Sequence, residues 1–304
     1  MQLYYWKSLE GNFGDDLNEW LWDELLPGWR EWDSDVTLVG VGTILNSGHF
    51  PINRPGRFLV LGSGVGNGSP PNISNKSKWD IRSLRGPISA SKLGLPQRIG
   101  IIDPAVMIPT LSSFRDIKKS SRPVFVPHIS SVDNFDWPEL CNSIGVDYVS
   151  PRDESRGVIK RLAGAPLVIA ESMHAAIIAD AFRTPWIATH ISSKFNAEKW
   201  SDWSSGMEFN LRIHPMFPWT ERLKSGSRSS ASSEVMMSST PNRKIFVHSS
   251  MKRRVRLWVE AALAKRALGR LLGVSPTLSS ETTLRTQQDK YKAMLAGVVN
   301  DYGK

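Results

Sequence analysis

The chain has 304 residues, 40% of them hydrophobic, which is enough for two domains with cores of their own. A single cysteine, Cys141, excludes an internal disulfide and a cysteine-based zinc site, and suits a reducing compartment. The net charge is +9, but residues 243–304 contain thirteen Lys and Arg against four Asp and Glu, so the preceding 242 residues are neutral. Because the positive charge is local, the main fold is not expected to bind nucleic acid.

The start of the chain indicates neither export nor a membrane span. Residues 1–6 predict a first strand rather than a signal peptide. No apolar run approaches the roughly 20 residues that cross a bilayer. We therefore expect a cytoplasmic protein.

Residues 1–115 alternate short apolar segments with glycine-containing turns, which predicts an N-terminal α/β domain with a parallel, Rossmann-like sheet. Strands are predicted at 3–6, 36–39, 58–61 and from 79, and helices at 17–26 and 87–94. The turns that follow these strands meet at one edge of the sheet, so they are candidate ligand-binding segments.

The turn after the first strand contains two glycines and two carboxylates. Gly11 and Gly14 allow backbone N–H groups to approach a ligand closely. We expect Asp15 to cap the next helix and Asp16 to project into the cleft. An ordinary capped turn has the same composition and is the alternative.

The turn Gly62-Ser63-Gly64-Val65-Gly66 is rich in glycine, but it lacks a Walker lysine and the spacing of the dinucleotide fingerprint. Neither ATP nor NAD is therefore expected. Arg85 precedes a helix that begins near Pro87, and it is predicted at the same edge of the sheet. A guanidinium there can hold a carboxylate or a phosphate with two hydrogen bonds. The alternative for Arg85 is an ion pair with a surface acid.

A second α/β series, residues 116–224, follows a polar linker at 110–122. Its predicted strands are 124–126, 146–149, 167–170 and 185–188, and its predicted helices are 137–143, 153–162 and 172–182. Ser172 is the expected N-cap of the last helix, which places His174 in the first turn, beside N–H groups that favour an anion. His128 follows an equivalent strand, so the two histidines are expected to share a pocket. A solvated or core histidine is the alternative for each.

The end of the chain differs from the rest in composition. Residues 225–250 are serine-rich and predict a linker, and 251–304 predict a basic helical tail. A helix over 251–272 has one apolar face, with Leu257, Ala264 and Leu268, and basic residues elsewhere. Such a helix either lies on the anionic inner face of a membrane or docks on the acidic N-terminal part of the protein.

Six short motifs occur in an order that resembles the polysaccharide pyruvyl transferase family, especially its exopolysaccharide branch. They are Asn12-Phe13-Gly14-Asp15-Asp16-Leu17-Asn18, Gly62-Ser63-Gly64, Leu84-Arg85-Gly86-Pro87, Asp103-Pro104-Ala105, Pro127-His128 and Glu171-Ser172-Met173-His174. The resemblance covers about residues 1–190. It implies two Rossmann-like domains facing a cleft, as in B-type glycosyltransferases.

The resemblance also implies an activity: transfer of pyruvate from phosphoenolpyruvate to two hydroxyls of one sugar, free or lipid-linked, giving a cyclic ketal. It implies no metal and no cofactor. The catalytic residues would be His174 as general acid, Asp15 or Asp16 as base, and His128 at the leaving phosphate. The substrate-binding residues would be Arg85, Ser172, Gly62, Ser63, Gly64 and Asn12.

The chain departs from the family pattern beside the motif histidine. Many members have an arginine two residues before it and a glycine after it, where this chain has Ser172 and Ala175. Two other functions therefore stay open. One is a nucleotide-sugar glycosyltransferase, in which Glu171 would hold the ribose. The other is a glycan-associated scaffold without catalysis.

Overall fold

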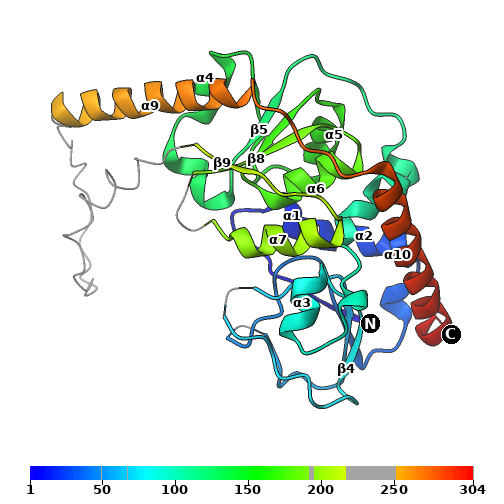
Figure 1. The fold of residues 1–304 in the computed structure, drawn as a ribbon. Helices are drawn as coiled ribbons and strands as arrows, with labels where there is room; N and C mark the ends of the chain where they lie inside the picture. The colour runs from blue at the N-terminus through cyan, green and yellow to red at the C-terminus, as the bar shows by residue number, and fades with distance from the viewer. Residues whose placement is uncertain (49, 67, 192–194, 217–250, 304) are drawn as a thin grey trace, which may run out of the picture.

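Figure 1 shows the computed structural model of the chain, which describes residues 1–48, 50–66, 68–191, 195–216 and 251–303. Side chains are described outside 251–258. The predicted serine-rich linker at 225–250 lies outside the described residues. Two parallel sheets with helices around them make this an α/β fold.

The first sheet has four parallel strands in the order of the sequence. They are β1 (Gln2–Tyr4), β2 (Val36–Val39), β3 (Arg57–Leu61) and β4 (Trp79–Ser83). Every residue of β2 is buried, as expected of an inner strand covered on both faces. The four strands predicted in this part of the chain are thus confirmed to within two residues.

The second sheet has five parallel strands in the order β6-β5-β7-β8-β9. Their bounds are β5 (Val124–Val126), β6 (Asp147–Tyr148), β7 (Val168–Ala170), β8 (Trp186–His190) and β9 (Ile213–Pro215). Four of these strands were predicted. The fifth, β9, is a short edge strand with a proline, which a strand pattern does not reveal.

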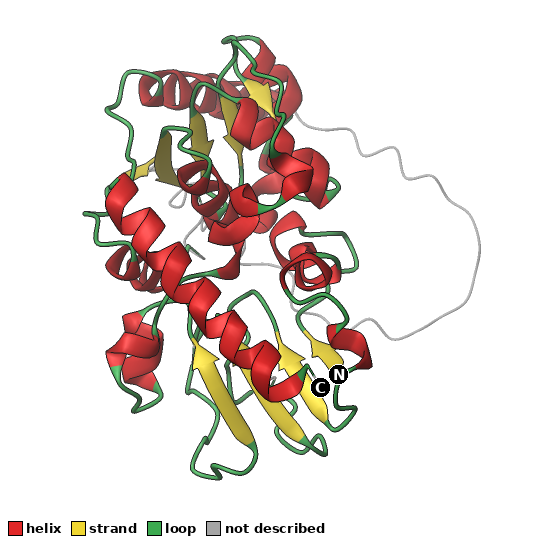
Figure 2. Ribbon diagram, turned by 90° about the vertical axis from the view of Figure 1, so that its right-hand side faces the viewer, coloured by secondary structure: helices red, strands yellow, loops and turns green. Residues whose placement is uncertain are grey.

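The α-helices lie between and beside the two sheets (Figure 2). Those before the C-terminal segment are α1 (Phe13–Asp16), α2 (Leu21–Leu25), α3 (Pro87–Lys92), α4 (Trp137–Asn142), α5 (Ser155–Gly164), α6 (Met173–Ala181) and α7 (Ala197–Gly206). The helix predicted at 17–26 is instead the 3₁₀ turn η1 (Leu17–Glu19) followed by α2, and the short helix α1 precedes both. Helix α7 was not predicted, and it supplies one described lining residue of the cavity described below, Lys199.

One hydrophobic core runs through both halves of the chain. It joins Phe13 of α1, Met107 of the 3₁₀ turn η4 (Pro104–Thr110), and Ile177 of α6. The backbone also links the halves, because the Phe13 N–H donates to the carbonyl of Pro151 at 2.9 Å. The α6 helix is therefore packed between the sheets, which fixes the position of its N-terminus.

The C-terminal helices are α9 (Met251–Leu271) and α10 (Glu281–Tyr302). Helix α10 packs on the first sheet, where the hydroxyl of Tyr302 donates to Asp80 at 2.7 Å and that of Tyr291 to the carbonyl of Leu61 at 2.8 Å. Leu284, Leu295 and Val298 of α10 are buried in the shared core. The expected tail is therefore an integral part of the fold.

Helix α9 lies beside α4 (Figure 1) and packs on the second sheet. Its side chains Ala264, Ala267, Leu268 and Leu271 are buried in a cluster with Trp137. The apolar face that the sequence offers to a bilayer is thus covered by protein over 264–271. Among the described residues, no helix is both long and apolar enough to cross a membrane.

Candidate functional site

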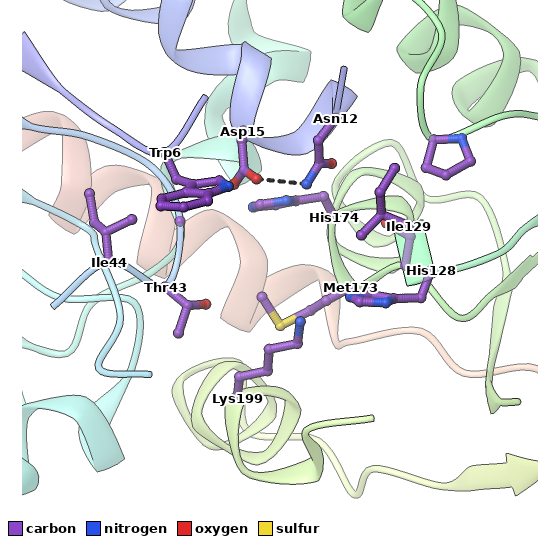
Figure 3. A pocket seen from close by; sticks show the side chains of 13 residues that line it. Trp6, Asn12, Asp15, Thr43, Ile44, His128, Ile129, Met173, His174 and Lys199 are labelled. Atoms are coloured by element: carbon purple, nitrogen blue, oxygen red, sulfur yellow. Dashed lines mark hydrogen bonds between the residues drawn. The ribbon is translucent and has the colours of Figure 1, made fainter. Parts of the chain in front are cut away.

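A cavity of about 260 Å³ lies between the two sheets (Figure 3). Its described lining residues all follow strands, at the carboxyl edges where parallel sheets bind ligands. They are Trp6, Asn12 and Asp15 after β1, Gly42, Thr43 and Ile44 after β2, His128 and Ile129 after β5, Pro151 after β6, Ser172, Met173 and His174 after β7, and Lys199 after β8.

His174 lies in the first turn of α6, as the sequence predicted, and its imidazole lines the cavity. The ring packs closely on Gly14, where an added Cβ would lie 2.0 Å from Nδ1. Its Nε2 faces Oδ2 of the buried Asp103 at 3.5 Å, longer than a formed hydrogen bond. Catalytic pairs of this kind often tighten when a ligand binds. Asp103 is therefore placed to stabilise a protonated imidazole.

The first turn after β1 contributes Asp15 rather than Asp16. Asn12 is the N-cap of α1 and its side-chain amide donates to Asp15 Oδ2 at 2.6 Å. Asp15 lines the cavity, whereas Asp16 accepts the backbone N–H of Asn12 at 3.0 Å. The N-cap is Asn12, three residues before the predicted Asp15, so Asp15 rather than Asp16 lines the cavity. Burial raises the pKa of Asp15 to about 6, although the nearby His174 and Lys199 oppose the shift.

Lys199 of α7 points its ammonium group into the cavity, toward His128 and Met173 (Figure 3). It is the one lysine or arginine among the described lining residues. Burial lowers its pKa to about 8, the positive Arg85 adds to this, and Asp15 and Glu171 oppose it. Our sequence reading missed this residue. The signal was present: Asn196 caps α7, and Trp200 and Trp203 supply its apolar face.

His128 and His174 share the cavity, as predicted from their equivalent strand ends. Burial lowers the pKa of His128 to about 4, and the charge of Lys199 lowers it further. His128 is therefore neutral near pH 7. Its Nδ1 accepts the backbone N–H of Ser130 at 3.3 Å, which leaves Nε2 as the N–H donor of the ring.

Arg85 lies behind the cavity wall rather than in it. Its side chain is fully buried and paired with Asp202 of α7, with Nε and Nη2 each 3.0 Å from Oδ2. Its Nη1 donates to Thr43 at 2.7 Å, and Thr43 lines the cavity. The partner is thus a buried acid, not the substrate that we predicted nor a surface carboxylate. Asp202 and Thr43 hold the guanidinium, and Arg85 is not among the described lining residues of the cavity.

Gly62, Ser63 and Gly64 are not among the described lining residues of the cavity. Gly62 packs on Pro104, and the Ser63 hydroxyl donates to the carbonyl of Gly40. Gly64 makes room for the buried arginine, because an added Cβ would lie 2.2 Å from its Cζ. This motif shapes the wall, and the cavity itself is lined by the turn after β2.

A sequence profile described as polysaccharide pyruvyl transferase matches residues 15–192, more than half of the chain. The chain belongs to the polysaccharide pyruvyl transferase family. It is also similar to the succinoglycan biosynthesis protein ExoV of Rhizobium meliloti (strain 1021), with 39% identity across 99% of this chain and 100% of the relative. As a pyruvyl transferase family member, the protein is a transferase.

Glu171 of this pyruvyl transferase family member is buried and engaged with the backbone. Its Oε2 accepts the N–H of His128 at 2.9 Å, and its Oε1 accepts that of Ile191 at 2.8 Å. It holds two strand ends together instead of facing the cavity, which removes the residue on which the nucleotide-sugar alternative depended. Among the described residues, no group of three His, Cys, Asp or Glu side chains has the arrangement of a metal site.

The Arg85–Asp202 pair predicts a large stability effect. Asp202→Ala leaves a buried guanidinium without its counter-charge and should lower the free energy of unfolding by about 3–5 kcal/mol. The control is Glu198→Ala on the same helix, which removes a partly exposed ion pair with Lys92 and should cost about 1 kcal/mol or less. Urea denaturation followed by circular dichroism measures both. Equal decreases in the free energy of unfolding of the two variants would show that the buried ion pair contributes no more to stability than the partly exposed one.

Proposed function

We propose that this transferase moves a pyruvyl group from phosphoenolpyruvate onto two hydroxyls of one exopolysaccharide sugar, releasing phosphate. The observation that carries the proposal is one cavity that holds an imidazole, a carboxylate of raised pKa and a buried ammonium. Family membership supports a pyruvyl group as the group transferred. The name of the relative, a succinoglycan biosynthesis protein, supports an exopolysaccharide acceptor. The acceptor is free or lipid-linked.

The donor needs cations and N–H groups, because it carries a carboxylate and a phosphate. Lys199 supplies the charge in place of the arginine that many family members have before the motif histidine. The N-terminus of the nine-residue helix α6 supplies N–H groups. The Ser172 side chain makes no capping hydrogen bond to them in the part of the chain that the structure describes, and Ser172, Met173 and His174 line the cavity.

The reaction proceeds through a proton transfer and two additions of oxygen. Protonated His174 gives its proton to the methylene carbon C3, and the resulting cation at C2 is attacked by a sugar hydroxyl, whose proton passes to Asp15. The second hydroxyl then forms a bond to C2 as the C2–O bond to phosphate breaks. Its proton returns to His174, and the proton held by Asp15 leaves with the phosphate. The N–H of His128 and the ammonium of Lys199 stabilise the departing phosphate.

The two shifted pKa values predict a bell-shaped dependence of kcat/KM on pH. Asp15 must be deprotonated to accept a proton, so activity should fall below about pH 6. Lys199 must be protonated to attract the donor, so activity should fall above about pH 8. Initial rates of phosphate release between pH 5 and 9 (roughly the working range) measure both limbs. A profile that is flat across this range would contradict the assignment of both groups.

The activity is tested with oligosaccharide fragments of succinoglycan from which mild acid has removed ketals. With phosphoenolpyruvate, the protein should release phosphate and give a ketal methyl signal in the proton NMR spectrum of the fragment. Fragments on a polyprenyl diphosphate carrier and free fragments distinguish the two acceptor forms. Stabilisation by UDP but not by phosphoenolpyruvate in a thermal-shift assay, without phosphate release, would refute the proposal and favour a glycosyltransferase.

A further inference from the structure

Trp6 is the exception among the tryptophans of this protein. Its side chain is 57% exposed, whereas every other tryptophan whose side chain the structure describes is buried or half-buried. The exposed part of an aromatic ring at a cavity can contact a ligand that enters the cavity, and covering that apolar area is favourable. Trp6 follows β1 and also lines the candidate catalytic cavity.

The position of Trp6 separates it from the groups that would hold the donor. Figure 3 shows the indole near Asp15, Thr43 and Ile44, on the side of the cavity opposite His128. The ammonium of Lys199 lies away from it, beside Met173. The cavity therefore has an anion-binding side and an aromatic side, with His174 and Asp15 between them.

The size of the cavity requires part of an oligosaccharide to lie outside it. At about 260 Å³ it is smaller than the pockets of roughly 300–1,000 Å³ that enclose a drug-sized ligand. A donor together with the reacting sugar would fill it, so the next sugars have to pass over the rim. The exposed indole at that rim offers a flat apolar face, and the C–H face of a pyranose ring is its natural complement.

We propose that Trp6 is the acceptor-binding platform, on which a sugar ring of the glycan stacks so that its hydroxyls reach Asp15. This inference rests on the proposed function for the reaction, and it adds which residue selects and orients the acceptor. Trp6 contacts the substrate and takes no part in proton transfer.

The kinetic test compares Trp6→Ala with Trp6→Phe, and uses Leu9→Ala as the control. Leu9 is on the same loop and fully exposed, but it is not among the described lining residues. Trp6→Ala should raise the KM for the de-ketalised succinoglycan fragments by about 10- to 100-fold and leave the KM for phosphoenolpyruvate within about twofold. Trp6→Phe keeps an aromatic face and should retain most of the affinity. Leu9→Ala should match the wild type.

A binding experiment without donor separates this inference from the proposed reaction. Saturation-transfer NMR on the wild type should show the fragments bound through ring C–H protons, and Trp6→Ala should lose that signal while phosphoenolpyruvate still stabilises it against heat. Equal signals from the wild type and Trp6→Ala, or none from the wild type, would overturn the platform. A third outcome is that the fragments bind the wild type and not Trp6→Ala, but the wild type releases no phosphate. That outcome would uphold the platform and refute the proposed reaction.

Discussion

Replacing His174 by glutamine should lower kcat by about 10²- to 10⁴-fold, with the KM for phosphoenolpyruvate changed by no more than a few-fold. Glutamine retains a polar side chain on α6, but its amide N–H is too weak an acid to protonate a carbon atom. The loss therefore falls on the chemical step rather than on binding. Phosphate release at saturating donor and acceptor measures it.

Two companion variants make this prediction specific. Asp103→Asn keeps the Oδ1 acceptor that caps η4 through Ala105 at 3.0 Å, but removes the charge opposite His174, so it should lower kcat without unfolding the protein. His128→Gln should lower kcat less than His174→Gln does, because neutral His128 contributes only an N–H. If His174→Gln released phosphate at the rate of the wild type, the general-acid role would be wrong.

Replacing Lys199 by methionine should raise the KM for phosphoenolpyruvate by about 30-fold or more, because the variant removes the buried positive charge that attracts the anionic donor. Methionine has a similar length and apolar stem, so packing on α7 is preserved. Lys199→Arg retains the charge and should recover part of the affinity. Lys92→Met, which removes a partly exposed lysine from the neighbouring helix α3, is the matched control and should leave the KM unchanged.

The same variant has a second readout that does not depend on donor affinity. The charge of Lys199 lowers the pKa of Asp15 and that of His128, so its removal should move both pKa values upward. The acid limb of the pH profile should therefore shift to higher pH in Lys199→Met, and the contribution of Lys199 to the basic limb, near pH 8, should be lost. An unchanged profile would show that Lys199 does not face the reacting groups.

The strand ends, and with them the position of the site, were predictable from sequence. Apolar runs at β2, β3, β5 and β7 are short and bounded by glycine or polar residues, and a parallel sheet gathers their carboxyl ends at one edge. His174 and His128 were found in this way. The same argument does not tell which of the turns at that edge line the cavity. The glycine-rich segment 62–64 was therefore predicted to bind substrate, whereas the turn after β2 lines the cavity.

The cations were predicted less well, for a physical reason. Arg85 and Lys199 both carry a charge next to an apolar segment, and sequence alone does not say which one a buried carboxylate will neutralise. Asp202, 117 residues from Arg85 in the chain, decides the question by pairing with the arginine, and this leaves Lys199 to the cavity. Long-range partners of this kind leave no local pattern. The position of Asp16 was wrong for a local reason, because Asn12 takes the capping role.

Helix α10 has a consequence for how the protein is made. Strand β4 is complete by residue 83, but the helix that packs against it ends only at Tyr302. During synthesis the ribosome must therefore deliver more than two hundred further residues before that edge is covered. Until then the surface of β4 that α10 covers stays exposed in the nascent chain. Exposed surfaces of this kind are the ones that chaperones bind.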